Sequence, residues 1–252
     1  MKELKKEITL FGGISILAGI MIGSGIFALG GIVLYRSGYS LGLSLLIWIV
    51  GGLITLFSGL TYAELGTMFP ETGGYYIYLR KAYGKGIAFL SGLMNFVLMS
   101  SGSIAVLALL FATILSFIYP VGDYIKYIAA ALIIVTSLIH YFGIKFGSLV
   151  QKIFLVAKLL PIFAIIGIGL FSGSEVVSLS LSTAEPISFF KLLPMIGFGI
   201  VGTLFAYEGW TNLNTVAGEM KNVKRDLPRA ILISTLLVMI VYVLFIFSIY
   251  RV

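Results

Sequence analysis

Cysteine is absent from the 252 residues, histidine occurs once, and charged residues make up only 11% of the chain. Without thiols there can be no disulfide, no thiolate nucleophile and no thiolate metal site. The sequence has no Gly-Lys-Ser/Thr phosphate-binding loop, which argues against an ATP-hydrolysing pump, and no His-Glu-x-x-His metal motif. We therefore expect no enzyme, no metal and no cofactor.

Hydrophobic residues, in contrast, make up 60% of the chain, and the mean hydropathy is +1.11. The long uncharged runs predict membrane helices rather than the alternating strands of a barrel. Seven spans are expected, near residues 8–34, 40–66, 86–118, 124–142, 149–171, 191–218 and 229–250. Residues 68–85 are polar and aromatic and should lie along the membrane surface, whereas residues 172–190 read as a solvated loop.

Positive charge is unevenly distributed between the two sides of these spans. Twelve lysines and arginines fall on the side of the N-terminus and four on the other, with Lys158 inside the fifth span. The positive-inside rule then predicts a multi-pass protein of the cell membrane with a cytoplasmic N-terminus. The net charge of +7 follows from this topology, so nucleic acid is not expected as a partner.

The first hydrophobic run, residues 8–34, carries no charge and contains seven glycines. At mid-membrane depth the run contains the sequence Gly23-Ser24-Gly25-Ile26-Phe27. Two glycines flanking a serine predict that the helix unwinds there, because glycine is costly in a helix interior. Amides exposed there, with the positive end of the following half-helix, would suit a small carboxylate. Alternatively, the glycines allow another helix to approach closely. This stretch alone leaves both interpretations open.

A second interruption is expected in residues 192–218, which contain Pro194, Gly197, Gly199, Gly202, Gly209 and, near the middle, Glu208. Two interrupted segments that open successive sets of spans favour an inverted-repeat transporter within one membrane domain. Residues 1–171 would form the first repeat and residues 172–252 the start of the second. Because only two spans of the second repeat are present, we expect a fragment or a protein completed by a second polypeptide.

Four ionisable residues are candidates for chemistry. Glu208 would bind an ammonium, couple protons or pair with a lysine, or else cap broken backbone. Lys158 would be a fixed cation against the unwound first helix or a proton carrier, or else would reach toward the interface. His140 is expected at the interface, with a proton relay as the alternative. Glu64 is expected to anchor the following loop rather than to take part in transport.

Three motifs together resemble a known family. The stretch AGIMIGSGIF (18–27) resembles the first-helix signature of amino acid permeases of the amino acid–polyamine–organocation superfamily. YAELG (62–66) followed by PETGGYY (70–76) is similar to the loop after their second helix. FAYEGW (205–210), with the residues up to 231, resembles the L-type amino acid transporter branch. The resemblance spans residues 18–231 and favours the transporter interpretation.

The resemblance implies a LeuT-type, all-α inverted-repeat fold and secondary active transport of amino acids, by exchange or by proton symport. Backbone around residues 24–26 would bind the substrate carboxylate, carbonyls beside both breaks would bind its ammonium, and Phe205 would gate the site. The implied substrate-binding residues are Met21, Ile22, Ser24, Gly25, Ile26, Phe205, Ala206, Glu208 and Gly209. Lys158 matches a lysine that replaces a sodium ion, which implies a coupling role without sodium.

The sequence departs from the family in three ways. The eighth and later helices are missing, and Glu208 stands where the branch often has a small residue. The loop at residues 119–123 lacks the cysteine that joins animal members to a glycoprotein, so no disulfide-linked partner is expected. The expected partners are the amino acid, the lipid bilayer and a polypeptide supplying the missing helices. A non-transporting remnant or a subunit of a split permease remains the alternative, and a channel or a membrane enzyme fits less well.

Overall fold

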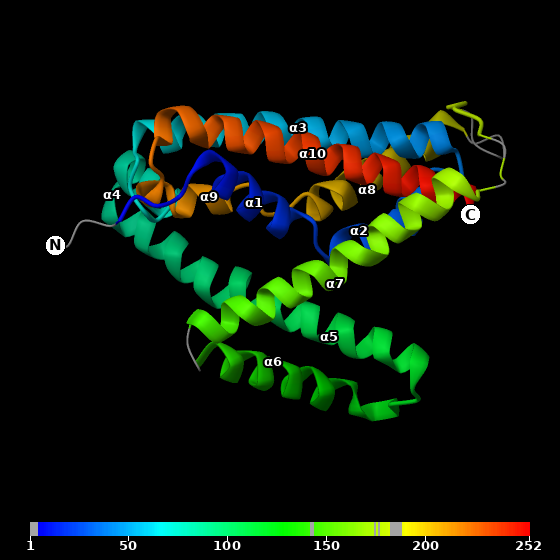
Figure 1. Ribbon diagram of the computed structural model, residues 1–252, viewed down its shortest axis with the longest axis horizontal. Helices are drawn as coiled ribbons and strands as arrows, with labels where there is room; N and C mark the ends of the chain where they lie inside the picture. Colours follow the sequence, from blue (N-terminus) through cyan, green and yellow to red (C-terminus); the bar gives the residue numbers. More distant parts are fainter. Residues whose placement is uncertain (1–4, 142–143, 174, 176, 182–187) are drawn as a thin grey trace. The chain divides into compact units, whose positions relative to one another are not determined.

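The computed structural model describes residues 5–141, 144–173, 175, 177–181 and 188–252, and it is helical throughout apart from turns and one isolated bridge (Figure 1). Its helices are α1 (Leu10–Met21), α2 (Ser24–Arg36), α3 (Leu41–Met68), α4 (Tyr75–Met94), α5 (Ser101–Ile118), α6 (Ile125–Tyr141), α7 (Ile144–Phe171), α8 (Phe189–Ala206), α9 (Asn212–Thr215) and α10 (Val223–Arg251). A π-helical segment, Asn95–Ser100, joins α4 to α5.

Within the residues that the structure describes, five helical segments are long and apolar enough to cross a membrane, which makes the chain a multi-pass membrane protein. They are Leu41–Met68, Tyr75–Ile118, Gly122–Ile139, Ile153–Phe171 and Val223–Arg251. The bent pair of α1 and α2 would make a sixth. The predicted sixth span at 191–218 is wrong in length, because the apolar helix there ends at Ala206 and the chain then turns.

The first helix begins later than predicted. Thr9 caps α1 by accepting a hydrogen bond from the Gly12 amide at 3.2 Å, so the helix starts at Leu10. Ile8, predicted as the first residue of the span, instead forms an isolated parallel bridge with Met220. The Ile8 carbonyl accepts from the Lys221 amide at 2.9 Å. The segment before α1 is therefore held against the chain that leads into α10.

The long segment Tyr75–Ile118 changes direction near its start. Gly84 lies inside α4 with φ +84°, in the left-handed region that favours glycine, and interrupts the helix there. The break lies two residues before residue 86, where the third span is predicted to begin. Residues 75–83 are thus a separate helical piece, in the part of the chain predicted to lie along the membrane surface.

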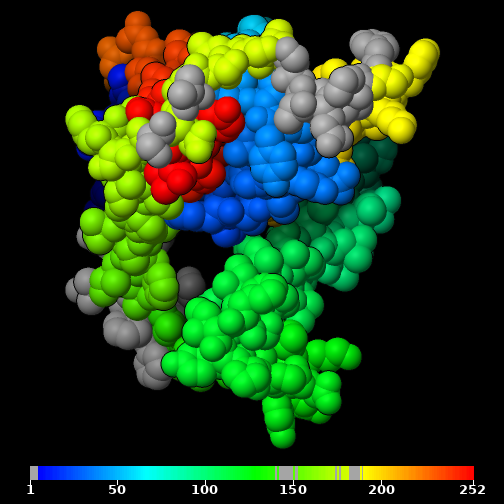
Figure 2. Space-filling view, turned by 90° about the vertical axis from the view of Figure 1, so that its right-hand side faces the viewer, coloured from blue at the N-terminus to red at the C-terminus, as the bar shows by residue number. Residues whose placement is uncertain are grey.

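The chain forms two compact units, one of Met1–Tyr78 with Lys158–Val252 and the other of Leu79–Ala157. In the second unit, α5 packs on α6 through the small buried side chains Ala108, Ala112 and Ala129. In the first unit, α10 packs along α3 and also contacts α1, and α8 packs against α2 and α3 (Figure 1). Figure 2 shows the C-terminal end of α10 (red) against the blue residues of α2 and α3.

Glycines on one face of α3 allow the neighbouring helices to approach closely. A Cβ added at Gly51 would lie 2.8 Å from the Thr203 Cβ of α8, and one at Gly59 would lie 2.7 Å from Ile231 of α10. Small residues of this kind are the usual contact surface between membrane helices, where apolar side chains gain little by leaving lipid. These contacts hold the C-terminal part of α8 against the rest of the first unit.

Replacing Gly51 by alanine is expected to lower the melting temperature of the detergent-solubilised protein by about 5 °C, because overpacking a helix contact typically costs about 1–3 kcal/mol. Thr203 cannot move away easily, since it is fully buried and its hydroxyl donates to the Ile200 carbonyl at 2.8 Å. Gly197 on α8 is the matched control, because a Cβ there meets nothing within 4 Å. Equal melting temperatures for Gly51→Ala and Gly197→Ala would contradict the packing described here.

Candidate functional site

The first predicted break is present and is shorter than expected. Helix α1 ends at Met21, α2 starts at Ser24, and the two axes meet at 53°. Only Ile22 (ψ 88°) and Gly23, in extended conformation, lie outside the helices. Ser24 to Phe27, predicted to unwind, instead form the first turn of α2. Their amides belong to a helix N-terminus, where the first N–H groups lack intrahelical partners and the dipole is positive.

The second break follows Ala206, the last residue of α8. The interruption predicted within residues 192–218 is present, but α8 runs through Pro194 and the glycines at 197, 199 and 202 without a break. Only Gly209 leaves the helical region, with φ +120°. Glycine lowers helix propensity without forbidding a helix, and tertiary packing decides the outcome. Beyond the break the chain forms only the four-residue α9.

The two breaks lie against each other. A Cβ added at Gly25 would lie 2.8 Å from the Cα of Ala206, and one at Gly209 would lie 2.6 Å from the Cγ2 of Ile20 and 3.4 Å from the Met21 amide nitrogen. The two interpretations of the first glycine cluster, an interrupted helix and a close approach of another helix, therefore both hold, at different residues. Gly23 lies in the break, whereas Gly25 allows the N-terminus of α2 to touch the C-terminus of α8.

Lys158 of α7 reaches the broken helix. Its Nζ donates to the Gly19 carbonyl at 2.5 Å. Gly19 lies in the last turn of α1, and its carbonyl has no helical partner because Gly23 is extended. A cation at this position stabilises the negative end of the helix dipole. The ammonium therefore lies against the first helix, as in one of the alternatives given for Lys158.

Tyr242 of α10 was missed by the sequence analysis and connects both breaks. Its side chain is fully buried, and its hydroxyl oxygen lies 2.7 Å from the Met21 carbonyl and 3.0 Å from the Ala206 carbonyl. Its ring packs edge-on against Trp48, with centroids 5.3 Å apart. A tyrosine hydroxyl in the apolar middle of a helix needs a partner in lipid, and this was the available signal.

The candidate residues differ in exposure. Met21, Ile22, Gly25, Ile26, Ala206 and Gly209 are buried, whereas Ser24, Phe205 and Glu208 are exposed, Phe205 to 60%. Within the described part of the chain, the Glu208 carboxylate has no hydrogen bond or ion pair, so neither the pairing with a lysine nor the alternative of capping broken backbone is found there. Glu64 is exposed on α3. The side chain of His140 lies outside what the structure describes.

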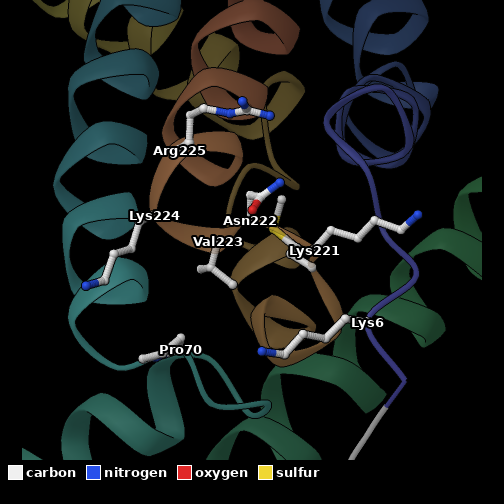
Figure 3. A pocket seen from close by; sticks show the side chains of 8 residues that line it. Lys6, Pro70, Lys221, Asn222, Val223, Lys224 and Arg225 are labelled. Atoms are coloured by element: carbon white, nitrogen blue, oxygen red, sulfur yellow. The ribbon is translucent and has the colours of Figure 1, made fainter.

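A separate cavity of about 360 Å³ lies where the chain enters α10, away from the two breaks. It is lined by Lys6, Pro70, Met220, Lys221, Asn222, Val223, Lys224 and Arg225. Figure 3 shows the Lys221 and Lys224 side chains pointing in opposite directions, and Arg225 is paired with Asp226 at 2.8 Å. These cations do not converge on one point, so the cavity is a basic surface rather than a second binding centre.

The helix ends at the two breaks present backbone groups of both polarities. The N-terminus of α2 offers amides, and the C-terminal ends of α1 and α8 offer carbonyls within the same contact region. Amides suit a carboxylate and carbonyls suit an ammonium, so neither charge of the ligand needs a full opposite charge from the protein.

Comparison with known proteins finds a family and several relatives that the chain resembles. The sequence profile of a family described as amino acid permease matches residues 8–252. The serine/threonine exchanger SteT of Bacillus subtilis is 37% identical over 241 residues. The human b(0,+)-type amino acid transporter 1 is 34% identical over 250 residues, and the mouse large neutral amino acids transporter small subunit 2 is 34% identical over 250 residues.

These matches cover 95–96% of this chain but only part of each relative: 53% of the bacterial exchanger, 50% of the human transporter and 46% of the mouse subunit. The chain thus spans about half the length of the curated relatives that it matches.

Proposed function

Because the chain belongs to the amino acid permease family, whose members are transporters and not enzymes, we propose that it carries out secondary active transport of amino acids across the cell membrane. Transport would proceed by alternating access in a LeuT-type fold, with residues 1–171 as the first repeat and 172–252 as the start of the second. The observation that carries the proposal is the contact between the two helix breaks, at Gly25 and Ala206.

In this proposal the substrate amino acid binds where the breaks meet. Its carboxylate accepts hydrogen bonds from the amides of Ser24, Gly25 and Ile26 at the start of α2. Its ammonium donates to carbonyls beside the breaks, those of Met21, Ile22, Phe205, Ala206 and Glu208. Gly209 supplies the turn beside them, and the exposed ring of Phe205 covers the site. The arrangement selects the groups common to all amino acids.

Coupling is assigned to exchange or to a proton, and not to sodium. The ammonium of Lys158 already donates a hydrogen bond to the Gly19 carbonyl at the end of α1. A metal cation is therefore not required to neutralise this helix end. Similarity to the bacterial relative, which is a serine/threonine exchanger, supports exchange. The excess of positive charge on the N-terminal side supports a cytoplasmic N-terminus.

The proposed partners are the amino acid, the lipid bilayer and a second polypeptide that supplies further helices. The second candidate is a remnant that binds an amino acid but does not complete the transport cycle.

Uptake of labelled amino acids into proteoliposomes tests the proposal. We expect uptake by the chain, or by the chain co-expressed with the product of an adjacent reading frame, and at least fivefold stimulation by amino acid inside the vesicles if it is an exchanger. Replacing external sodium with choline should leave uptake unchanged. Dependence on an imposed pH gradient would instead identify a proton symporter. Absence of uptake in both preparations would contradict transport and leave the remnant.

A further inference from the structure

The basic cavity of about 360 Å³ lies at one end of the first unit, where the chain leads into α10 (Figure 3). Its lining comes from three stretches of chain: the segment before α1, the loop after α3 and the start of α10. The start of α1, the end of α3 and the start of α10 therefore lie at the same end of the unit (Figure 1). Because α3 and α10 are long and apolar enough to cross a membrane, this end lies at the depth of the lipid headgroups.

Backbone hydrogen bonds fix two of the stretches that line the cavity against each other. The amides of Glu7 and Ile8 donate to the Glu219 carbonyl at 2.9 and 3.0 Å. In return, the Lys221 amide donates to the Ile8 carbonyl at 2.9 Å. Lys6 directly precedes this paired segment, so it is held beside the start of α10. The cavity is therefore bounded by an ordered backbone rather than by two independent loops.

The lining of the cavity carries four cationic side chains and no carboxylate. The cations are Lys6, Lys221, Lys224 and Arg225, and all four are exposed. Arg225 pairs with the buried carboxylate of Asp226 at 2.8 Å. Among the residues that the structure describes, none places a carboxylate within ion-pair distance of the three lysines. Three ammonium groups thus remain available to an anion from outside the protein.

The directions of these side chains distinguish between two kinds of anion. A small soluble anion is bound by donors that converge on it, whereas Lys221 and Lys224 point in opposite directions (Figure 3). A layer of headgroups offers phosphates on every side, and long side chains that spread apart can each meet one. Large apolar side chains are also exposed at this end of the helices: Phe11 in the first turn of α1 and Met68 at the end of α3. These suit contact with acyl chains.

We propose that the surface formed by Lys6, Lys221 and Lys224 binds the phosphate groups of anionic phospholipids in the leaflet on the N-terminal side of the protein. Basic clusters immediately beside the ends of membrane helices attract anionic lipid, and each lysine contributes about fivefold to the affinity. The bound headgroups hold the start of α10 and the segment before α1 at the membrane surface. This surface lies apart from the two helix breaks, so it binds lipid whether or not the chain transports amino acids.

Binding of phospholipid to the purified protein in neutral detergent tests the proposal, with native mass spectrometry as the readout. Phosphatidylglycerol and phosphatidylcholine with identical acyl chains are compared. We expect phosphatidylglycerol to bind at least tenfold more tightly, and the preference to shrink as salt is raised. The double variant Lys221→Gln/Lys224→Gln should weaken binding of phosphatidylglycerol at least tenfold and leave phosphatidylcholine unchanged.

Two further double variants separate the charge from the fold. Lys221→Arg/Lys224→Arg keeps the charge and should bind phosphatidylglycerol within about twofold of the unsubstituted protein. Lys126→Gln/Lys191→Gln removes the same charge from exposed positions on α6 and α8 and should also stay within about twofold. Equal affinity for the two lipids, or equal weakening by the two glutamine variants, would overturn the proposal.

Two competitors separate lipid from other occupants of the surface. Glycerol 3-phosphate, which has the phosphate without acyl chains, should not displace phosphatidylglycerol at millimolar concentration. Displacement would identify a site for a soluble phosphate compound and would contradict a lipid surface. Co-purification with the product of an adjacent reading frame should leave the bound phosphatidylglycerol in place. Its loss on assembly would show that the basic surface contacts a protein instead.

Discussion

Replacing Gly25 by alanine is expected to reduce amino acid uptake at least 100-fold. The added Cβ would lie 2.8 Å from the Cα of Ala206, closer than real Cβ atoms approach, and the atom that it meets belongs to the backbone. No side-chain rotation relieves this clash, so the N-terminus of α2 and the C-terminus of α8 must separate. Their separation would move the α2 amides away from the carbonyls of α8. The proposed site could then no longer bind the carboxylate and the ammonium of one amino acid together.

The matched control is Gly31→Ala. Gly31 lies on the same helix, and a Cβ there meets nothing within 4 Å, so the variant carries the same change in helix propensity without the clash. Uptake by Gly31→Ala should stay within about twofold of the unsubstituted protein. Melting temperatures of both variants should be measured in detergent alongside uptake. If Gly25→Ala transports as well as Gly31→Ala, the contact between the breaks is not part of the binding site.

Replacing Lys158 by methionine is expected to reduce uptake at least 30-fold. Methionine keeps much of the side-chain volume and loses the ammonium that donates to the Gly19 carbonyl at 2.5 Å. The end of α1 would then carry an unsatisfied carbonyl beside the break, and a buried acceptor without a donor typically costs about 1–3 kcal/mol. Arginine should not restore uptake, because the short Nζ contact leaves no room for a guanidinium.

Lys126→Met is the control for the loss of one positive charge, since Lys126 is exposed on α6. Its uptake should match that of the unsubstituted protein in the same vesicles. Uptake by Lys158→Met that equals uptake by Lys126→Met would remove Lys158 from the mechanism. Uptake by Lys158→Met that becomes sodium-dependent would support the proposal that the ammonium takes the place of a metal cation.

The sequence predicted the positions of the breaks better than their extent. Gly23 and Gly209 do interrupt helices, because an extended or positive-φ backbone is accessible to glycine at little steric cost. The glycines at 197, 199 and 202 have the same local freedom and remain helical, since a neighbouring helix packs against that stretch. Local composition therefore indicates where a helix can break, and tertiary contacts decide where it does.

The partners of the breaks were harder to predict. Lys158 was identified because a charge inside a span demands an explanation, and its Nζ contacts the broken first helix. Tyr242 was not, because a tyrosine in an apolar helix is common at membrane interfaces and carries no charge. Its partners, Met21 and Ala206, come from two other helices, and no local pattern in α10 encodes their positions.

The measurement that tests the central claim most directly is competition for binding of a labelled amino acid to the purified protein. Three unlabelled competitors suffice: the same amino acid, its methyl ester, and the acid lacking the amino group. If the joined breaks hold both charged groups, the ester and the acid should each compete at least 50-fold more weakly than the amino acid. Competition by either single-group analogue at the strength of the amino acid would contradict a site built from both breaks.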